Sequence, residues 1–162
     1  MPHPSVVDGP SLLTTLADAG VEFITVGGTA AALHGSPMFT ADLDIVHRRT
    51  PENVARLVAV LESLDAWFRA DLTGRKLRPT AGHLSGPGQS LLATRLGPLD
   101  SLGTLHDGRG FDDLLPHTVA VPLRERTLRV LDLPTLIDLK VSIGRDKDVA
   151  AVAHLTPLLR DK

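Results

Sequence analysis

The chain has 162 residues, a formal net charge of −2 at pH 7 and an apolar fraction of 43%. This length predicts one domain over residues 1–162, with enough apolar side chains for a core. The absence of cysteine excludes disulfides, thiolate zinc sites and cysteine nucleophiles, and is typical of a cytoplasmic protein. Because no apolar run could span a bilayer and the first ten residues lack the apolar centre of a signal peptide, we expect no membrane partner.

The first half of the chain predicts alternating helices and strands. Helical periodicity and stop signals favour helices at residues 11–19, 29–33 and 50–64, and β-branched or alternating runs favour strands at 22–26 and 42–47. Thr50 is a favourable N-cap, and Pro51 suits the first position of the helix that follows.

The second half has weaker periodicity and more glycine and proline. Its pattern predicts a loop over 73–88 with a short strand at 76–78, a hairpin of strands 90–96 and 99–105, strands 118–122 and 127–131, and helices 134–143 and 146–159. We expect Gly97-Pro98 to form the hairpin turn. A polar loop over residues 106–116, with one helical turn, would connect the hairpin to the next strand. Helices and strands mixed along the whole length indicate an α/β or α+β fold.

Two glycines stand directly between a predicted strand and a predicted helix. Gly27-Gly28 would let the backbone bend sharply and approach a ligand closely. The free N–H groups of the following helix would favour an anion such as phosphate. On its own, however, a glycine pair after a strand is more often a simple turn.

Two aspartates lie two residues apart in the second predicted strand. Asp42 and Asp44 would point to the same face, where their like charges favour a neutralising cation. Mg²⁺ prefers such oxygen ligands, and metal pairs can clamp the oxygens of a nucleotidyl transfer. The alternative interpretation is a solvated strand end.

Together these motifs resemble the nucleotidyltransferase superfamily of the DNA-polymerase-β type. The 13 residues between Gly27-Gly28 and Asp42-Leu43-Asp44 match the spacing in that superfamily. The resemblance implies a mixed sheet flanked by helices, Mg²⁺ or Mn²⁺ as cofactor, and a third carboxylate on a later strand. Asp100, in the stretch Leu99-Asp100-Ser101-Leu102, is the best candidate for it, and Asp71 is the second choice.

The C-terminal part is similar to one branch, the compact bacterial nucleotidyltransferase-like proteins related to abortive-infection toxins of toxin–antitoxin pairs. That branch has a helical lysine and an Arg-x-Lys-Asp block close to the nucleotide. In this sequence these positions are Lys140, Arg145, Lys147 and Asp148. The alternative for this block is a helix surface with ordinary charge pairs.

The resemblance implies a metal-dependent enzyme that moves a nucleoside monophosphate from an NTP to an acceptor hydroxyl. The NTP would contact Gly27, Gly28, Thr29 and Thr40, together with the C-terminal block. The acceptor would be the 3′ end of a tRNA or a protein, and a toxin of this kind would have a cognate antitoxin or partner protein. The slight negative charge disfavours tight, non-specific binding to RNA.

One departure from the resemblance leaves a second function open. Relatives often carry an arginine at the position of Met38, so a phosphate contact is missing unless Arg75, Lys76 or Arg78 replaces it. The loss of that arginine favours a non-catalytic nucleotidyltransferase-like binding module or partner subunit, whereas the retained aspartates favour an enzyme. A third interpretation is a small α/β protein with neither metal nor nucleotide.

Overall fold

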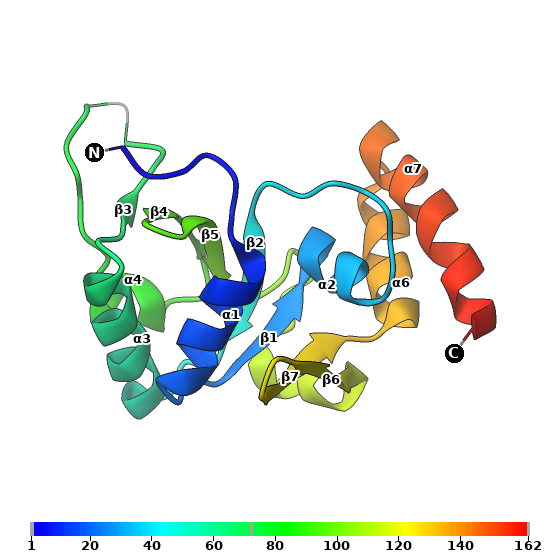
Figure 1. Ribbon diagram of the computed structural model, residues 1–162, viewed down its shortest axis with the longest axis horizontal. Coiled ribbons are helices and arrows are strands. Elements are labelled where there is room, and N and C mark those ends of the chain that lie inside the picture. The colour runs from blue at the N-terminus through cyan, green and yellow to red at the C-terminus, as the bar shows by residue number, and fades with distance from the viewer. Residues whose placement is uncertain (1, 72, 162) are drawn as a thin grey trace.

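The computed structural model describes residues 2–71 and 73–161 and, of residues 146, 147, 160 and 161, the backbone alone. Its centre is a mixed seven-stranded sheet with strand order β3-β4-β5-β2-β1-β7-β6 (Figure 1). The strands are β1 (Phe23–Val26), β2 (Leu43–His47), β3 (Trp67–Phe68), β4 (Gln89–Thr94), β5 (Gly97–Leu102), β6 (Thr118–Leu123) and β7 (Arg126–Leu131). The β1–β7 and β2–β5 pairs are parallel and the other neighbours are antiparallel.

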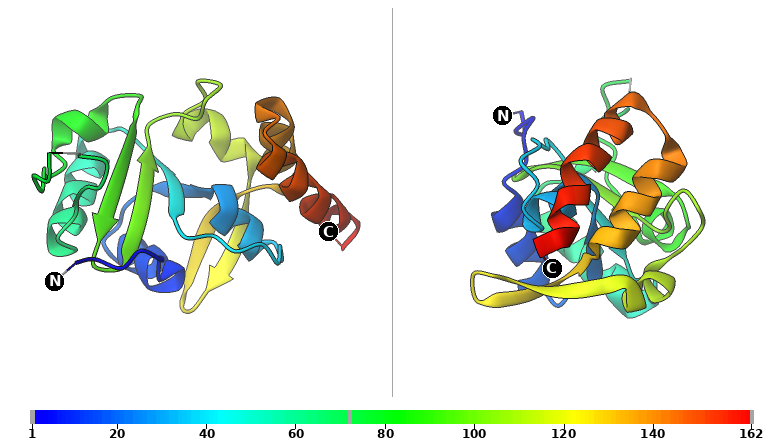
Figure 2. Two further views of the ribbon diagram at one scale, coloured as in Figure 1. Left: turned by 90° about the horizontal axis from the view of Figure 1, so that it is seen from above. Right: turned by 90° about the vertical axis from the view of Figure 1, so that its right-hand side faces the viewer.

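Helices flank the sheet and stand at both of its ends. They are α1 (Gly9–Asp18), α2 (Gly27–Leu33), α3 (Pro51–Ser63), α4 (Ala81–Ser85), α5 (Phe111–Leu114), α6 (Leu133–Ile143) and α7 (Asp146–Leu155), with 3₁₀ turns at Leu115–His117 and Thr156–Asp161. The α3–α4 pair and the α6–α7 pair stand at opposite ends of the molecule (Figures 1 and 2). No helix within the described ranges has the length and apolar character needed to cross a membrane. The expected mixed sheet with flanking helices is therefore confirmed.

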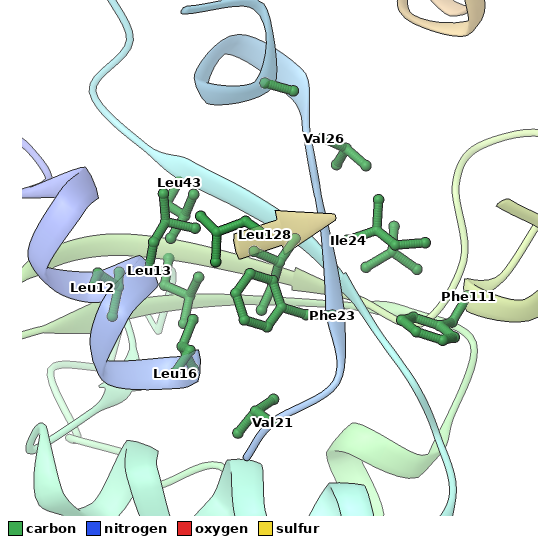
Figure 3. Close-up of a cluster of buried hydrophobic side chains, with 14 of the residues drawn as sticks. Leu12, Leu13, Leu16, Val21, Phe23, Ile24, Val26, Leu43, Phe111 and Leu128 are labelled. Atoms are coloured by element: carbon green, nitrogen blue, oxygen red, sulfur yellow. The ribbon is translucent and has the colours of Figure 1, made fainter. Parts of the chain in front are cut away.

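Strand β1 is the centre of the core because both of its faces are buried. On one side Phe23 packs with Leu128 and the leucines of α1, and on the other Ile24 lies toward Phe111 (Figure 3). A strand buried on both faces reads as a continuous apolar run, which explains why its sequence shows no alternation. Because β1 is fixed in this way, the turn that follows it has a well-defined position.

The predicted hairpin is present, but its turn lies two residues earlier than expected. Thr94 pairs with Gly97, so Arg95 and Leu96 form the turn and Gly97 begins β5. A Cβ on Gly97 would come within 2.4 Å of the Val7 Cα, and its φ is +107°. This glycine therefore serves the close passage of the N-terminal segment, a reason that local sequence does not reveal.

Two expectations in the middle of the chain were wrong. Residues 76–78 form no strand; instead Trp67 and Phe68 pair with β4, and the Phe68 N–H donates to the Leu77 carbonyl. The expected loop over 73–88 contains α4, which the Thr80–His83 capping box starts. Helix α7 also ends at Leu155, earlier than predicted, and a 3₁₀ turn continues from there.

Candidate functional site

The centre of the candidate site is the pairing of β2 with β5. In this parallel register Asp44 stands opposite Asp100, and on the other side of β2 it stands opposite Val26 at the end of β1. Paired residues on neighbouring strands project to the same face of a sheet. Two carboxylates that are 56 residues apart in the sequence thus meet beside the β1–α2 turn.

Asp42 precedes β2 and is held through its backbone. The hydroxyls of Thr40 and Thr29 donate to the Asp42 carbonyl, at 2.9 and 3.3 Å respectively. The Asp42 side chain is 41% exposed. The two threonines expected at the nucleotide therefore position the first aspartate, and Thr40 also borders a pocket described below.

Arg69, which the sequence analysis did not single out, joins two of the three carboxylates. Its Nη2 lies 2.6 Å from Asp100 Oδ1 and 3.5 Å from Asp42 Oδ2. Its Nη1 donates to the Leu92 carbonyl at 3.1 Å. Only the pairing of β3 with β4 brings this arginine to the site, so no local signal could have found it. The second-choice Asp71 is bonded to Thr73 and Arg75 instead.

Asp44 and Asp100 hold their protons more strongly than free aspartates do. Burial, followed by repulsion from Asp100, a hydrogen bond to Asp100 and repulsion from Asp42, raises the pKa of Asp44 to about 7. Burial also raises the pKa of Asp100, although the Arg69 guanidinium acts in the opposite direction. Asp44 Oδ1 is buried without a hydrogen-bond partner. The site therefore favours added positive charge.

The two glycines allow the backbone to approach these groups closely. A Cβ on Gly27 would stand 2.3 Å from Asp44 Oδ2, and the φ of Gly27 is +65°. A Cβ on Gly28 would stand 2.9 Å from the Thr40 side chain. Any larger residue at either position would displace Asp44 or the segment that carries Asp42.

The C-terminal block forms a second charged cluster where α6 meets α7. Asp148 is fully buried; it accepts from Arg145 Nε at 2.6 Å and lies 3.3 Å from Lys140 Nζ. The ion pairs hold the pKa of Asp148 below its usual value, chiefly through the hydrogen bond from Arg145. The side chain of Lys147 lies outside the described residues. Asp148 thus orients both described cations.

Two pockets meet between the carboxylates and this cluster. The larger, about 520 Å³, is bordered by Gly27, Asp44, Lys140 and Arg145, with an apolar wall from Leu102, Leu105, Leu136, Leu139 and Ile143. The smaller, about 220 Å³, is bordered by Gly27, Gly28, Thr40, Lys140 and Asp148, with Met38 and Phe39 at its edge. Gly27 and Lys140 border both, so a ligand could extend from one pocket into the other.

The cations suggested as replacements for the arginine missing at Met38 have other partners. Arg75 lies near Asp71, Arg78 pairs with Asp65, and Lys76 stands over the Trp67 ring. None of the three borders either pocket. In the described part of the chain, Arg69 is the arginine that pairs with the carboxylates of the site.

The donor set suits a divalent cation in its chemistry, although it is not arranged as a finished metal site. Carboxylate oxygens are hard ligands, and the buried, unpartnered Asp44 Oδ1 would gain a partner from a metal ion. Among the side chains that the structure describes, however, no three from His, Asp or Glu are grouped so that they could hold one. Arg69 bridges two of the oxygens that a metal would need.

Comparison with solved structures identifies the fold. The chain is similar to the lincosamide antibiotic adenylyltransferase LnuA bound to lincomycin, with a TM-score of 0.65 and 12% identity over 96% of this chain and 99% of that one. It is also similar to a candidate nucleotidyltransferase from Thermotoga maritima, with a TM-score of 0.53 and 19% identity over 98% of both chains.

A third match is an antigenic nucleotidyltransferase-like protein from Paracoccidioides brasiliensis, with a TM-score of 0.59 and 14% identity over 93% of this chain and 74% of that one. No protein-family model and no curated protein matches the sequence. The fold is therefore nucleotidyltransferase-like, and identities this low establish the fold alone.

Proposed function

We propose that this protein transfers a nucleoside monophosphate from an NTP to the hydroxyl of an acceptor. The observation that carries the proposal is the pairing of Asp44 with Asp100 across β2 and β5, directly beside the Gly27 turn and the larger pocket. In a nucleotidyltransferase-like fold, carboxylates paired beside a glycine turn and a pocket would be suited to an NTP, a divalent metal and an acceptor.

Each group would have a separate task. Gly27 and Gly28 border the smaller pocket, where their backbone would face the triphosphate, and Lys140 would offset the charge that develops on it. Asp42, Asp44 and Asp100 would hold Mg²⁺ or Mn²⁺, which supplies Lewis-acid stabilisation of the phosphoryl oxygens when bound.

In the transfer itself the acceptor oxygen would form a bond to the α-phosphorus while the bond to pyrophosphate breaks. The acceptor proton would pass to Asp100, whose raised pKa suits a general base. Arg145 and Asp148 would support this chemistry indirectly, because Asp148 orients Arg145 and Lys140 at the edge of the pockets.

The larger pocket favours a small hydroxylated acceptor over a macromolecule. Its volume of about 520 Å³ and its apolar wall are typical of sites that enclose small molecules. LnuA, with the same fold, is a lincosamide adenylyltransferase, and this points in the same direction. The 3′ end of a tRNA, or a protein, remains the acceptor class to test against it, and a toxin role with a cognate antitoxin would follow from that result.

The experiment is incubation with each α-labelled NTP and Mg²⁺ in the presence of small hydroxylated compounds, total RNA or lysate proteins. We expect label on a small molecule with the wild type and none with Asp44→Ala. Asp18→Ala is the matched control, since Asp18 is an exposed aspartate paired with Arg126 on another part of the surface. Label on RNA or protein would change the acceptor class but preserve the reaction.

A non-catalytic module is the second candidate, and two observations favour it. Met38 occupies the place of an arginine in relatives, and Arg69 neutralises two of the carboxylates. If no NTP gives labelled product with any acceptor class, while nucleotide still raises the melting temperature, the module is the better description.

A further inference from the structure

Arg69 reaches the carboxylates from the edge of the sheet. It follows β3 directly, and its N–H donates to the Leu91 carbonyl, which extends the β3–β4 pairing by one bond. One nitrogen of its guanidinium is held by the Leu92 carbonyl and the other bridges Asp100 and Asp42. The guanidinium therefore lies where the oxygens of two carboxylates converge.

We propose that Arg69 is an internal counter-ion that a divalent cation must displace from Asp42 and Asp100 in order to bind. The inference rests on the metal site of the proposed function and assigns to Arg69 a positioning role. Under this proposal the Arg69 guanidinium and a divalent metal ion compete for the oxygens of Asp42 and Asp100.

Steric and electrostatic arguments support competition. The Arg69 Nη2 lies 2.6 Å from Asp100 Oδ1 and 3.5 Å from Asp42 Oδ2, so a metal at about 2.1 Å from these two oxygens would lie very close to the guanidinium. Two cations cannot share that place, since like charges at such short distance repel strongly. A group of three carboxylates paired with a single guanidinium also retains excess negative charge, which attracts the divalent ion.

The position of Arg69 at the sheet edge allows its guanidinium to leave the carboxylates. Strand β3 has two paired residues and lies at the sheet edge, and the Arg69 side chain is 28% exposed. Leaving the carboxylates costs the guanidinium two ion pairs and one hydrogen bond to Leu92, while solvent is available to hydrate it. When it is bound, it holds Asp42 and Asp100 together and gives these two carboxylates of the metal-free site an ion-pair partner.

The test is titration of the full chain with MnCl₂ or MgCl₂ by calorimetry, without nucleotide, together with thermal unfolding in EDTA and in saturating metal. The variants are Arg69→Gln, which removes the charge, and Arg69→Lys, which keeps it but cannot bridge Leu92 and both carboxylates. Arg75→Gln is the control, because Arg75 is an exposed arginine in the following loop.

We expect Arg69→Gln to bind Mn²⁺ about tenfold more tightly than the wild type, corresponding to about 1.4 kcal/mol. It should melt lower in EDTA and regain the difference in saturating metal. Arg69→Lys should fall between the two in affinity, and it serves as the test if the glutamine variant does not fold. Arg75→Gln should match the wild type.

Equal or weaker metal binding by Arg69→Gln and Arg69→Lys would overturn the inference, as would a loss of stability that metal does not reverse. An absence of metal binding in the wild type and both variants would overturn it too. Failure of the proposed function looks different: tighter metal binding by the variants with no labelled product on any acceptor would refute the transfer reaction and leave the role of Arg69 intact.

Discussion

The carboxylate centre on β2 and β5 and the cation cluster on α6 and α7 border the same 520 Å³ pocket, but they are held in different ways. Asp44 and Asp100 are positioned by backbone pairing of adjacent strands, with Arg69 added from the sheet edge. Lys140 and Arg145 are positioned by side-chain bonds to Asp148. The first arrangement is set by the strand register, whereas the second depends on three side chains and can readjust.

The difference in charge follows the same division. One centre has three carboxylates and one guanidinium, and the other has, among its described side chains, two cations and one buried carboxylate. A triphosphate–metal complex placed between them would meet negative charge on the metal side and positive charge on the phosphate side. The comparison predicts that the carboxylate centre determines whether transfer occurs and that the cation cluster determines how fast.

The largest expected effect separates the two regions by activity. Asp44→Ala should lower kcat/KM for transfer by more than about 1000-fold, and Lys140→Ala by about 10- to 100-fold. Asp44→Ala should leave the melting temperature unchanged or higher, because it relieves repulsion with Asp42 and Asp100. The measurement is steady-state transfer alongside thermal unfolding, with Asp18→Ala as control. Full activity in Asp44→Ala would refute the metal-site assignment. Equal losses of kcat/KM in Asp44→Ala and Lys140→Ala would show that the two regions do not differ in their contribution to transfer.

A second prediction tests the rigidity of the carboxylate centre. Gly27→Ala should lower the free energy of unfolding by at least about 2 kcal/mol, because its new Cβ meets Asp44 in a left-handed backbone. Gly108→Ala is the matched control: its φ is also positive, at +88°, but nothing lies within 4 Å of its Cβ position. Urea unfolding measures both.

Gly27→Ala should lower the free energy of unfolding by less when Asp44→Ala is also present, because the new Cβ no longer meets the carboxylate. A double-mutant cycle would measure this difference. If Gly27→Ala lowered the free energy of unfolding no more than Gly108→Ala does, the turn at Gly27 would have room to move. The rigidity inferred for the carboxylate centre would then be wrong.

A third prediction concerns the cation cluster. Asp148→Ala should lower the free energy of unfolding by about 2 kcal/mol at pH 7, because it removes the charged hydrogen bonds to Arg145 and Lys140. The pKa of Asp148 is lower in the folded chain, so this stabilisation is present above the usual value of 3.8 and is lost as the pH falls further. Asp138→Ala, on the exposed side of α6, is the control. If the wild type and Asp148→Ala still differed in free energy of unfolding at pH 2, the stabilisation could not come from the ion pairs of Asp148.

A fourth prediction concerns the pH dependence of the stability of the metal-free protein. Because the folded-state pKa of Asp44 is raised from 3.8 to about 7, the folded chain binds more protons than the unfolded chain between these values. The contribution of Asp44 to stability is therefore highest below pH 3.8 and is lost as the pH rises toward 7.

Asp44→Asn should remove this part of the pH dependence in urea titrations with EDTA from pH 4 to 8. Asp18→Asn should leave it in place. Identical pH profiles for the wild type and Asp44→Asn would show that Asp44 titrates normally.

Much of the element order could be predicted because it follows local rules. The N-cap Thr50 accepts from the Asn53 N–H, and Pro51 begins α3 as expected. The strands predicted at 118–122 and 127–131 are present as β6 and β7, which pair with each other. Each of these elements is fixed by neighbours in the sequence.

The wrong predictions involve partners that are distant in the sequence. Gly97 was assigned to a turn because its contact with Val7 is invisible locally. Strand β3 was missed because two residues are too few to show a periodicity. They form a strand only through their pairing with β4.

The sequence by itself determined most of the order of the elements, the glycine turn after β1 and the spacing of Asp42 and Asp44, since these depend on residues within a few positions of one another. Only the tertiary structure decided that Asp100 stands opposite Asp44, that Asp148 is buried between two cations, and that Arg69 pairs with Asp42 and Asp100. The physical reason is that strand register and ion pairing depend on packing between segments that are far apart along the chain, and local side-chain patterns do not carry that information.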